Sequence, residues 1–145
     1  MENGKTIQFE GIGTHWVIEI FGKTTSIENI EKKIRERIDK FDRNYSRFRD
    51  DSFVTKISKA SGTYELPKDA LPLLDFYQQL YKLSDGLVTP LIGNTLEQAG
   101  YDANYSLKPK ILTTPPAWED ALGIEGNKIR LKQSVVLDFG AAGKG

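Results

Sequence analysis

One stretch guides the interpretation of the whole sequence: Val135-Val-Leu-Asp-Phe-Gly-Ala-Ala-Gly-Lys-Gly145. Its apolar, β-branched start followed by glycines predicts a strand from Val135 to Phe139 that ends in a tight turn. Small residues allow a ligand to approach the backbone, whose N–H and C=O groups then become available for binding. Asp138 and Lys144 stand at opposite ends of this loop. We interpret the stretch as half of a ligand site whose other half is missing.

The composition is typical of a soluble globular domain and disfavours several kinds of site. The 145 residues are 39% hydrophobic and 28% charged, which allows a real core and argues against disorder. Twenty basic and twenty acidic residues cancel, so charge gives no reason to expect nucleic acid or a membrane as partner. The chain has no cysteine and a single histidine, His15. Disulfides and thiolate metal sites are therefore excluded, and a Ser-His-Asp triad is not expected.

No apolar stretch has the length of a signal peptide or a membrane span. We therefore expect a cytoplasmic protein, or an exported one that has been trimmed.

Residue periodicity predicts strands at the N-terminus. Thr6 to Phe9 forms one, and the alternation from Trp16 to Phe21 forms another. Between them, Gly11-Ile-Gly-Thr14 predicts a flexible elbow, for which a hairpin turn is the ordinary interpretation.

Two main helices follow. Apolar residues recur at helical spacing from Ile27 to Phe41, preceded by the capping-box pattern Thr25-Ser-Ile-Glu28 with Thr25 as the N-cap. The mixed charges on the other faces of this helix indicate a solvated surface with ion pairs four residues apart. The second helix begins at Leu66-Pro-Lys-Asp69 and ends at Gly86, and its aromatic-rich face is typical of a core.

The remaining patterns predict shorter elements. Phe53 and Ile57 indicate a short helical turn, and Thr114-Pro-Pro-Ala-Trp118 begins a short helix that ends at Gly123. The pair Gly126-Asn127 between two strand-like runs predicts a hairpin over residues 124–131. We therefore predict a single α+β domain over residues 1–145, with N-terminal strands, two main helices and a C-terminal meander.

Two further segments carry possible ligand contacts. Tyr45-Ser-Arg-Phe-Arg-Asp-Asp-Ser52 combines arginines with aromatic rings, and guanidinium pairs with phosphate and stacks on flat rings. The alternative is a charged junction between a helix and a loop. Ser84-Asp-Gly-Leu-Val-Thr-Pro90, with Gly93, predicts a shaped loop. None of the glycine-rich loops fits the GxGxxG or GxxxxGK[ST] nucleotide fingerprints.

The order of these segments resembles the FAD:protein FMN transferase family, also known as the ApbE family. That family has an opening Met-Gly-Thr, a Phe-Ser-x-Tyr-Arg-x-Asp-Ser segment, an Asp-Gly-x-Phe-Asp-Pro-x-Val-Gly loop and a Leu-Asp-Leu-Gly-x-x-x-Lys-Gly loop. Here the corresponding segments are Ile12-Gly-Thr14, residues 45–52, residues 84–93 and residues 137–145. The resemblance spans residues 12–145.

The resemblance implies an ApbE-like (T-fold-like) α+β fold with antiparallel sheets and two main helices, its C-terminal part absent. It implies a Mg²⁺-dependent transferase that uses FAD as substrate. Such an enzyme attaches FMN through a phosphoester to a threonine or serine of a target flavoprotein and releases AMP. FAD and the acceptor flavoprotein would be the partners of this chain.

Matching positions to the family's motifs implies site residues but leaves the catalytic residues unknown. Departures from the family's pattern include Ile12, which replaces methionine, Phe48, which replaces tyrosine, and Thr89, which replaces an acid. The carbonyl of Ala141 would be one metal ligand. The implied FAD contacts are Ile12, Phe48, Leu87, Val88, Thr89, Asp138 and Lys144.

Members of the family continue well past this last loop, with further metal ligands and a histidine in their later half. One carbonyl is too few ligands for Mg²⁺. We therefore expect the chain to be inactive alone and to need a complementary C-terminal segment or chain. The alternatives are a flavin-binding module or FAD pyrophosphatase that labels no protein, and a small α+β interaction domain.

Overall fold

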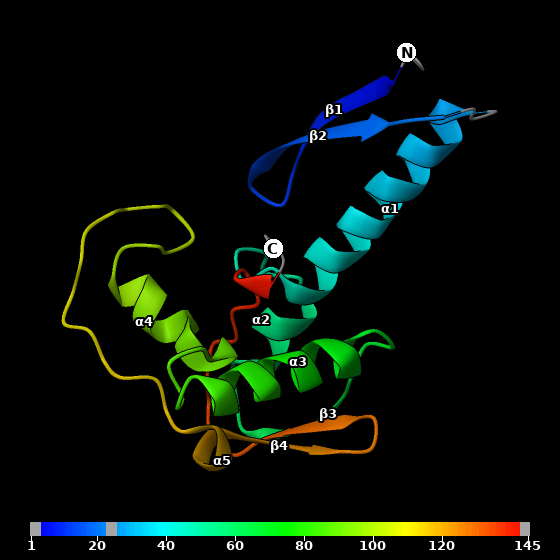
Figure 1. The fold of residues 1–145 in the computed structure, drawn as a ribbon. Coiled ribbons are helices and arrows are strands. Elements are labelled where there is room, and N and C mark those ends of the chain that lie inside the picture. The colour runs from blue at the N-terminus through cyan, green and yellow to red at the C-terminus, as the bar shows by residue number, and fades with distance from the viewer. Residues whose placement is uncertain (1–3, 23–25, 143–145) are drawn as a thin grey trace. The chain divides into compact units, whose positions relative to one another are not determined.

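A computed structural model describes residues 4–22 and 26–142. The chain divides into two compact units, residues 1–43 and residues 44–145. Within the described ranges, no helix has the length and apolar character needed to cross a membrane. Figure 1 shows the elements in chain order.

The first unit opens with a β-hairpin. Strands β1 (Lys5–Gly11) and β2 (Thr14–Ile20) pair antiparallel, from Lys5 opposite Ile20 to Gly11 opposite Thr14. The rings of the cross-strand pair Phe9 and Trp16 are stacked with their centroids 6.3 Å apart. Both N-terminal strands and the hairpin turn between them are thereby confirmed, although β2 begins and ends earlier than predicted.

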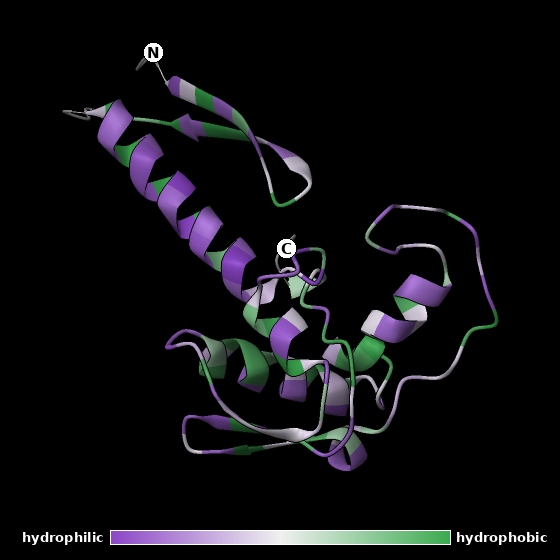
Figure 2. Cartoon of the chain, turned by 180° about the vertical axis from the view of Figure 1, so that it is seen from behind, coloured by the Kyte–Doolittle hydropathy of each residue, from purple (hydrophilic) through white to green (hydrophobic). Residues whose placement is uncertain are grey.

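Helix α1 (Ile27–Tyr45) follows the hairpin and confirms the predicted helix, whose apolar spacing runs from Ile27 to Phe41. The side-chain oxygen of Ser26 accepts the backbone N–H of Asn29 at 3.2 Å, whereas the predicted N-cap, Thr25, lies outside the described residues. Most of the helix surface is hydrophilic (Figure 2). Arg35 pairs with Glu31 at 2.7 Å, four residues away, which confirms the predicted solvated and ion-paired face.

The second unit contains a three-stranded antiparallel sheet in the order β3-β5-β4. Its strands are β3 (Gly62–Glu65), β4 (Leu122–Glu125) and β5 (Lys128–Leu131). The predicted hairpin at Gly126-Asn127 is confirmed as the β4–β5 turn. The core of this unit includes Leu74 and Tyr77 of α3 (Ala70–Leu83) and Ile129 and Leu131 of β5.

Among the described residues of this unit, four short helical segments complete the fold. The expected helical turn is α2 (Phe53–Ile57), whose N-cap Ser52 accepts the N–H of Thr55 at 3.1 Å. The proline-containing segment forms a 3₁₀ helix, η1 (Pro90–Ile92), which continues into α4 (Gly93–Gln98). Helix α4 and strand β3 were not predicted. Helix α5 (Trp118–Ala121) is the predicted short helix, but it ends before Gly123, which lies in β4.

The predicted strand from Val135 to Phe139 is wrong. Val135, Leu137 and Phe139 are buried in alternation, as in a strand, but no strand pairs with this segment in the part of the chain that the structure describes. Its backbone instead bonds to the start of η1 and α4, where Asp138 N–H donates to the Pro90 carbonyl at 2.8 Å and Gly93 N–H donates to the Val136 carbonyl at 3.1 Å. A helical partner in place of a strand explains the error. The α+β class with antiparallel sheets is confirmed.

Candidate functional site

The segment from Leu137 to Ala142 is held on the core by its apolar side chains. Leu137 and Phe139 are buried, and the Phe139 ring meets the rings of Tyr45 and Tyr77 edge-on, with centroids 5.5 and 5.4 Å away. Such edge-to-face contacts stabilise aromatic clusters. Because neighbouring side chains of an extended backbone alternate in direction, Asp138 projects away from this cluster.

Both carboxylate oxygens of Asp138 have a hydrogen-bond donor. The N–H of Gly140 donates to Oδ1 at 2.8 Å, and Nε of Arg47 donates to Oδ2 at 2.5 Å. The two side chains are largely removed from solvent, with 4% of Arg47 and 14% of Asp138 exposed. A charge-assisted bond at this burial is stronger than one at the surface. The Arg47–Asp138 bond joins the 45–52 segment directly to residues 137–142.

Arg47 has two further neighbours. Its guanidinium carbon lies 4.1 Å from the centroid of the Phe48 ring, within cation–π distance. Its Nη1 lies 3.8 Å from Oε1 of Glu97, an ion pair without a hydrogen bond. Within the protein, Arg47 thus contacts an aromatic ring and takes a carboxylate as its partner, while a contact of this segment with a ligand stays a prediction. Arg49 binds Asp51 locally at 2.9 Å, as a charged junction would.

Tyr77 of α3 also contacts the last segment. Its hydroxyl oxygen accepts the N–H of Ala142 at 3.1 Å. Burial raises the pKa of this hydroxyl above its ordinary value, and the nearby charge of Asp138 acts in the same direction, while the N–H groups of Ala142 and Ala141 oppose the rise. Tyr77 is a core residue, as its place on the apolar face predicts. Sequence reasoning missed its hydroxyl contact, because helical spacing indicates a buried face and not a distant partner.

The segment 84–93 contributes backbone to the same place. The Pro90 carbonyl accepts Asp138 N–H, and the preceding Thr89 is buried, its Oγ1 accepting Leu91 N–H at 3.2 Å as the cap of η1. Val88 is half-buried and its N–H donates to Ser84 Oγ at 2.9 Å. Leu87 is 83% exposed. Of the three implied contacts, Leu87 therefore offers the most open side chain, and Thr89 has a structural role as a cap.

Phe48 presents a half-exposed ring at this site. Its exposed fraction is 41%, and the ring of Tyr105 stacks on it with centroids 5.3 Å apart and planes inclined by 18°. Tyr105 comes from the irregular segment after α4, in which it has a positive φ of 46°. The ring of Tyr105 is flat, as the ring of a ligand that stacks on Phe48 would be.

Ile12 lies in the first unit, at the tip of the hairpin. Ile12 and Gly13 have φ values of 51° and 68° between the paired residues Gly11 and Thr14, which defines a tight turn of the I′ kind. Side chains of Thr14 and Trp16 both donate to the Gly11 carbonyl, at 3.1 and 2.9 Å. A β-branched residue is strained at positive φ, and such strain occurs often at ligand sites.

The structure thus brings together Phe48, Thr89 and Asp138 within the second unit, through the bonds of Asp138 to Arg47 and Pro90. Ala141 follows in the same loop, next to Ala142, whose N–H binds Tyr77. Lys144 lies outside the described residues. The described ranges contain no group of three or more His, Cys, Asp or Glu that could hold a metal ion. The Ala141 carbonyl is one hard oxygen, whereas Mg²⁺ takes about six ligands in octahedral geometry. The described residues do not form a magnesium site by themselves.

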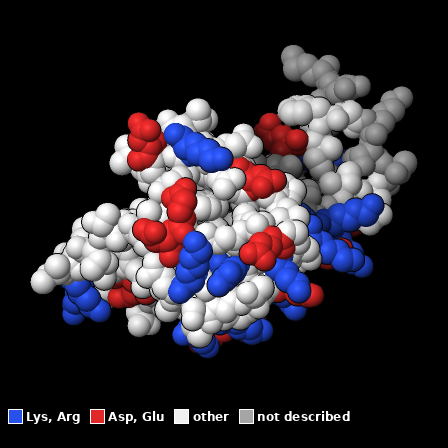
Figure 3. Space-filling view, turned by 90° about the horizontal axis from the view of Figure 1, so that it is seen from below, with Lys and Arg blue, Asp and Glu red and all other residues white. Residues whose placement is uncertain are grey.

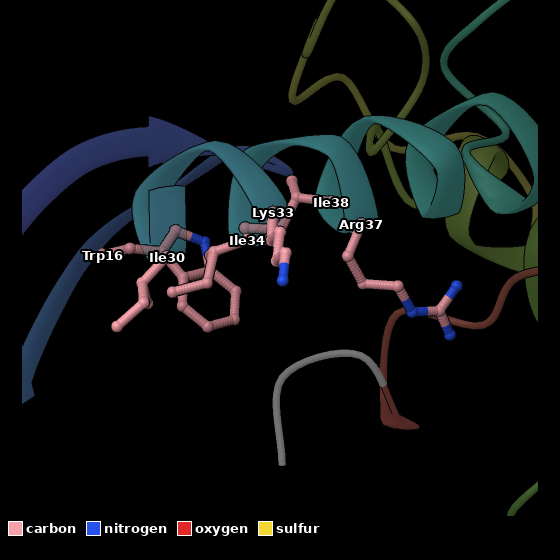
Figure 4. A pocket seen from close by; sticks show the side chains of 6 residues that line it. All are labelled: Trp16, Ile30, Lys33, Ile34, Arg37 and Ile38. Atoms are coloured by element: carbon pink, nitrogen blue, oxygen red, sulfur yellow. The ribbon is translucent and has the colours of Figure 1, made fainter. Parts of the chain in front are cut away.

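A shallow groove of about 340 Å³ in the first unit is lined by apolar residues of β2 and α1 with two basic side chains at its edge (Figure 4). Its lining is Trp16, Ile30, Lys33, Ile34, Arg37 and Ile38. Basic and acidic side chains are interspersed on the face drawn in Figure 3. This agrees with a chain whose charges cancel.

Comparison with known proteins supports the resemblance seen in the motifs. The family model described as the ApbE family matches residues 12–145. The chain belongs to the ApbE family. A comparison with curated proteins found no match.

Solved structures of ApbE proteins share the fold at low identity. A flavinyl transferase ApbE from Pseudomonas stutzeri, in its apo form, has a TM-score of 0.78 and 18% identity, covering 95% of this chain and 50% of that one. A flavin transferase ApbE from Vibrio cholerae gives 0.83 and 14%, covering 96% and 48%. An ApbE protein from Thermotoga maritima gives 0.81 and 20%, covering 99% and 49%. The chain spans about half the length of these structures.

Proposed function

We propose that this chain supplies part of the FAD site of a flavin transferase. The observation that carries the proposal is the convergence of three family segments on one place: Arg47 and Phe48, the Pro90 carbonyl, and Asp138 with the loop to Ala142. These segments lie far apart in sequence and are joined by hydrogen bonds, from Arg47 Nε to Asp138 Oδ2 and from Asp138 N–H to the Pro90 carbonyl. Family membership gives this arrangement its functional meaning.

In the proposed reaction, FMN passes from FAD to a threonine or serine of a target flavoprotein. The acceptor hydroxyl oxygen forms a bond to the phosphorus of the FMN moiety while the pyrophosphate P–O bond breaks. AMP leaves with the electron pair, and the hydroxyl proton passes to a base or to water. Mg²⁺, when bound, would neutralise charge on the pyrophosphate. Its other ligands would come from a complementary C-terminal segment or chain.

The roles of the residues of this chain follow from their exposure and chemistry. Phe48 offers a half-exposed ring for a flat ligand group, and Leu87 adds apolar surface. Asp138 is an acceptor whose orientation is already set by Arg47 and Gly140, and each carboxylate oxygen retains capacity for a donor from the ligand. Ile12 and Lys144 complete the proposed FAD contacts, and the Ala141 carbonyl is the proposed metal ligand.

The direct test is covalent labelling. The chain, its complementary C-terminal piece, FAD and Mg²⁺ are mixed with a target protein that carries an acceptor threonine. We expect flavin fluorescence on the denatured target and a mass increase equal to one FMN moiety. The matched control is the same target with valine in place of the acceptor. Unlabelled target under these conditions would contradict the proposal.

The same mixture separates a second candidate, FAD pyrophosphatase activity. It is favoured by Thr89, which replaces the family's acid and uses its hydroxyl to cap η1. Release of AMP and free FMN without labelling would identify a hydrolase. FAD that binds without being cleaved would identify a flavin-binding module.

A further inference from the structure

Arg47 has no role in the family pattern. In the pattern Phe-Ser-x-Tyr-Arg-x-Asp-Ser, matched here by residues 45–52, Arg47 occupies the first position that accepts any residue. An arginine between a helix and a loop is ordinarily exposed. Here only 4% of its side chain is exposed. A charge removed from water to this degree needs specific partners.

Those partners are the two implied FAD contacts nearest to it. Arg47 Nε donates to Asp138 Oδ2, and its guanidinium carbon lies 4.1 Å from the Phe48 ring centroid. Because Gly140 N–H holds the other oxygen of Asp138, the carboxylate cannot turn without breaking one of two bonds. The Arg47 side chain thus fixes the orientation of the Asp138 carboxylate and restrains the Phe48 ring.

We propose that Arg47 is a positioning residue of the flavin site, which holds the Asp138 carboxylate and the Phe48 ring in the arrangement that FAD meets. The inference rests on the proposed function, because it takes Asp138 and Phe48 as FAD contacts. Fixing both groups before binding reduces the ordering that the ligand must impose, and so strengthens binding without a new ligand contact.

The geometry of the guanidinium favours this role over a purely structural one. Nη1 is buried and makes no hydrogen bond within the described residues, and its nearest carboxylate, that of Glu97, is 3.8 Å away. Arginine–carboxylate pairs frequently use both arms of the guanidinium fork. Arg47 instead uses Nε for Asp138 and leaves a buried donor unpaired, which is unfavourable for folding.

The test compares FAD binding by variants of the native full-length protein. Arg47→Met keeps the length of the side chain and removes its charge and donors, Arg47→Lys keeps the charge without the fork, and Asp138→Asn weakens the acceptor. The matched control is Arg130→Met, the same change at an exposed position of β5 in the same unit. The Kd for FAD is measured by quenching of flavin fluorescence.

We expect Arg47→Met to weaken FAD binding by about tenfold or more, since it leaves a largely buried carboxylate without its charged partner. Arg130→Met should stay within about twofold of wild type, with Arg47→Lys between the two. Combined with Asp138→Asn, Arg47→Met should add less than about twofold, because the two side chains act through one contact. Unchanged FAD affinity in Arg47→Met, or fully additive losses in the double variant, would overturn the inference.

A second readout needs no flavin. Amide hydrogen exchange over residues 138–142 should become faster in Arg47→Met and stay as in wild type in Arg130→Met. If wild-type protein binds no FAD, the proposed function fails. Exchange then decides about Arg47 alone: faster exchange keeps it as the residue that positions Asp138, and unchanged exchange removes that role too.

Discussion

Two irregular segments of the second unit, residues 137–142 and residues 101–113, differ in what holds them. The first is fixed by distant groups: Arg47 binds Asp138, the Pro90 carbonyl accepts its N–H, and the Tyr77 hydroxyl accepts Ala142 N–H. Its apolar side chains are buried. Its shape is therefore dictated by the rest of the fold.

The second segment is held mainly by its own residues and by the adjacent α4. Asp102 accepts hydrogen bonds from the N–H groups of Asn104 and Ser106, both at 3.0 Å, and Thr113 N–H donates to Gln98 Oε1 at 2.7 Å. Ile111 is 90% exposed. The difference teaches that irregular backbone near a site can be held either by distant groups of the fold or mainly by local bonds, here with the stacking of Tyr105 on Phe48 as the distant contact.

Gly93→Ala should have the largest effect among tests of the difference between the two segments. Gly93 packs directly against Val136, so the change disturbs the contact that holds residues 135–139. A Cβ at Gly93 would lie 2.4 Å from the Val136 carbonyl oxygen and 2.6 Å from its Cγ1. Because backbone must move to relieve this overlap, we expect a loss of about 3 kcal/mol or more in the free energy of unfolding. Urea denaturation measures it. Gly123→Ala, where no atom lies within 4 Å of the new Cβ, is the control and should lose far less.

A matched pair of leucines comes next. Leu137→Ala should cost about 2–5 kcal/mol, because the side chain is fully buried and leaves a cavity. Leu112→Ala, the same change in the exposed segment, should stay within about 0.5 kcal/mol of wild type. Equal losses in thermal or urea unfolding would show that the two segments are not held differently.

Tyr77→Phe should have a smaller effect, about 1 kcal/mol, because it removes one hydrogen bond to Ala142 N–H while keeping the ring. The raised pKa of Tyr77 gives this effect a pH dependence. The neutral hydroxyl stabilises the fold fully below the pKa of the unfolded chain, about 10, and this stability is lost as the pH rises toward the folded pKa. In Tyr77→Phe, this part of the decrease in the free energy of unfolding at alkaline pH should be absent. An identical alkaline profile would contradict the assignment.

The smallest effect is expected in the second segment. The pKa of Asp102 is lowered, first by the hydrogen bond from the Ser106 hydroxyl. Its contribution to local order is present above the unfolded pKa of about 4 and is lost as the pH falls through the folded value. We expect limited proteolysis at residues 101–107 to become faster below about pH 4, and Ser106→Ala to be faster already at neutral pH. If neither change alters the cleavage rate, the Asp102–Ser106 hydrogen bonds do not order this segment.

Local patterns predicted much of the fold. Three elements were predicted correctly from sequence alone: the strand around Trp16, helix α1 with its isoleucine spacing, and the turn at Gly126-Asn127. Each is determined mainly by residues that are neighbours in sequence. Strand β3 was missed, since Gly62-Thr-Tyr-Glu65 is too short to show a clear alternation. Helix α4 was missed because it opens with Gly93 and Asn94, which are poor helix formers.

The site was predicted less completely, for a physical reason. The motif order identified Phe48 and Asp138, but the partners of Asp138 depend on contacts across 91 and 48 positions, to Arg47 and Pro90. Sequence spacing carries no signal for such contacts. An arginine at a helix end is ordinarily solvated, and Tyr77 looks like any other core tyrosine. Only the folded structure distinguishes these two residues from their neighbours.

The turn at Ile12 bears on any attempt to stabilise this protein. Asparagine is far better suited than isoleucine to a φ of 51° beside Gly13, so Ile12→Asn should gain about 1 kcal/mol in stability. It would also delete the apolar side chain that the proposed function places against FAD. A consensus or design procedure that scores folding alone would therefore select against ligand binding at this position. The first residue of the hairpin turn thus distinguishes sequences chosen for folding from sequences chosen for binding.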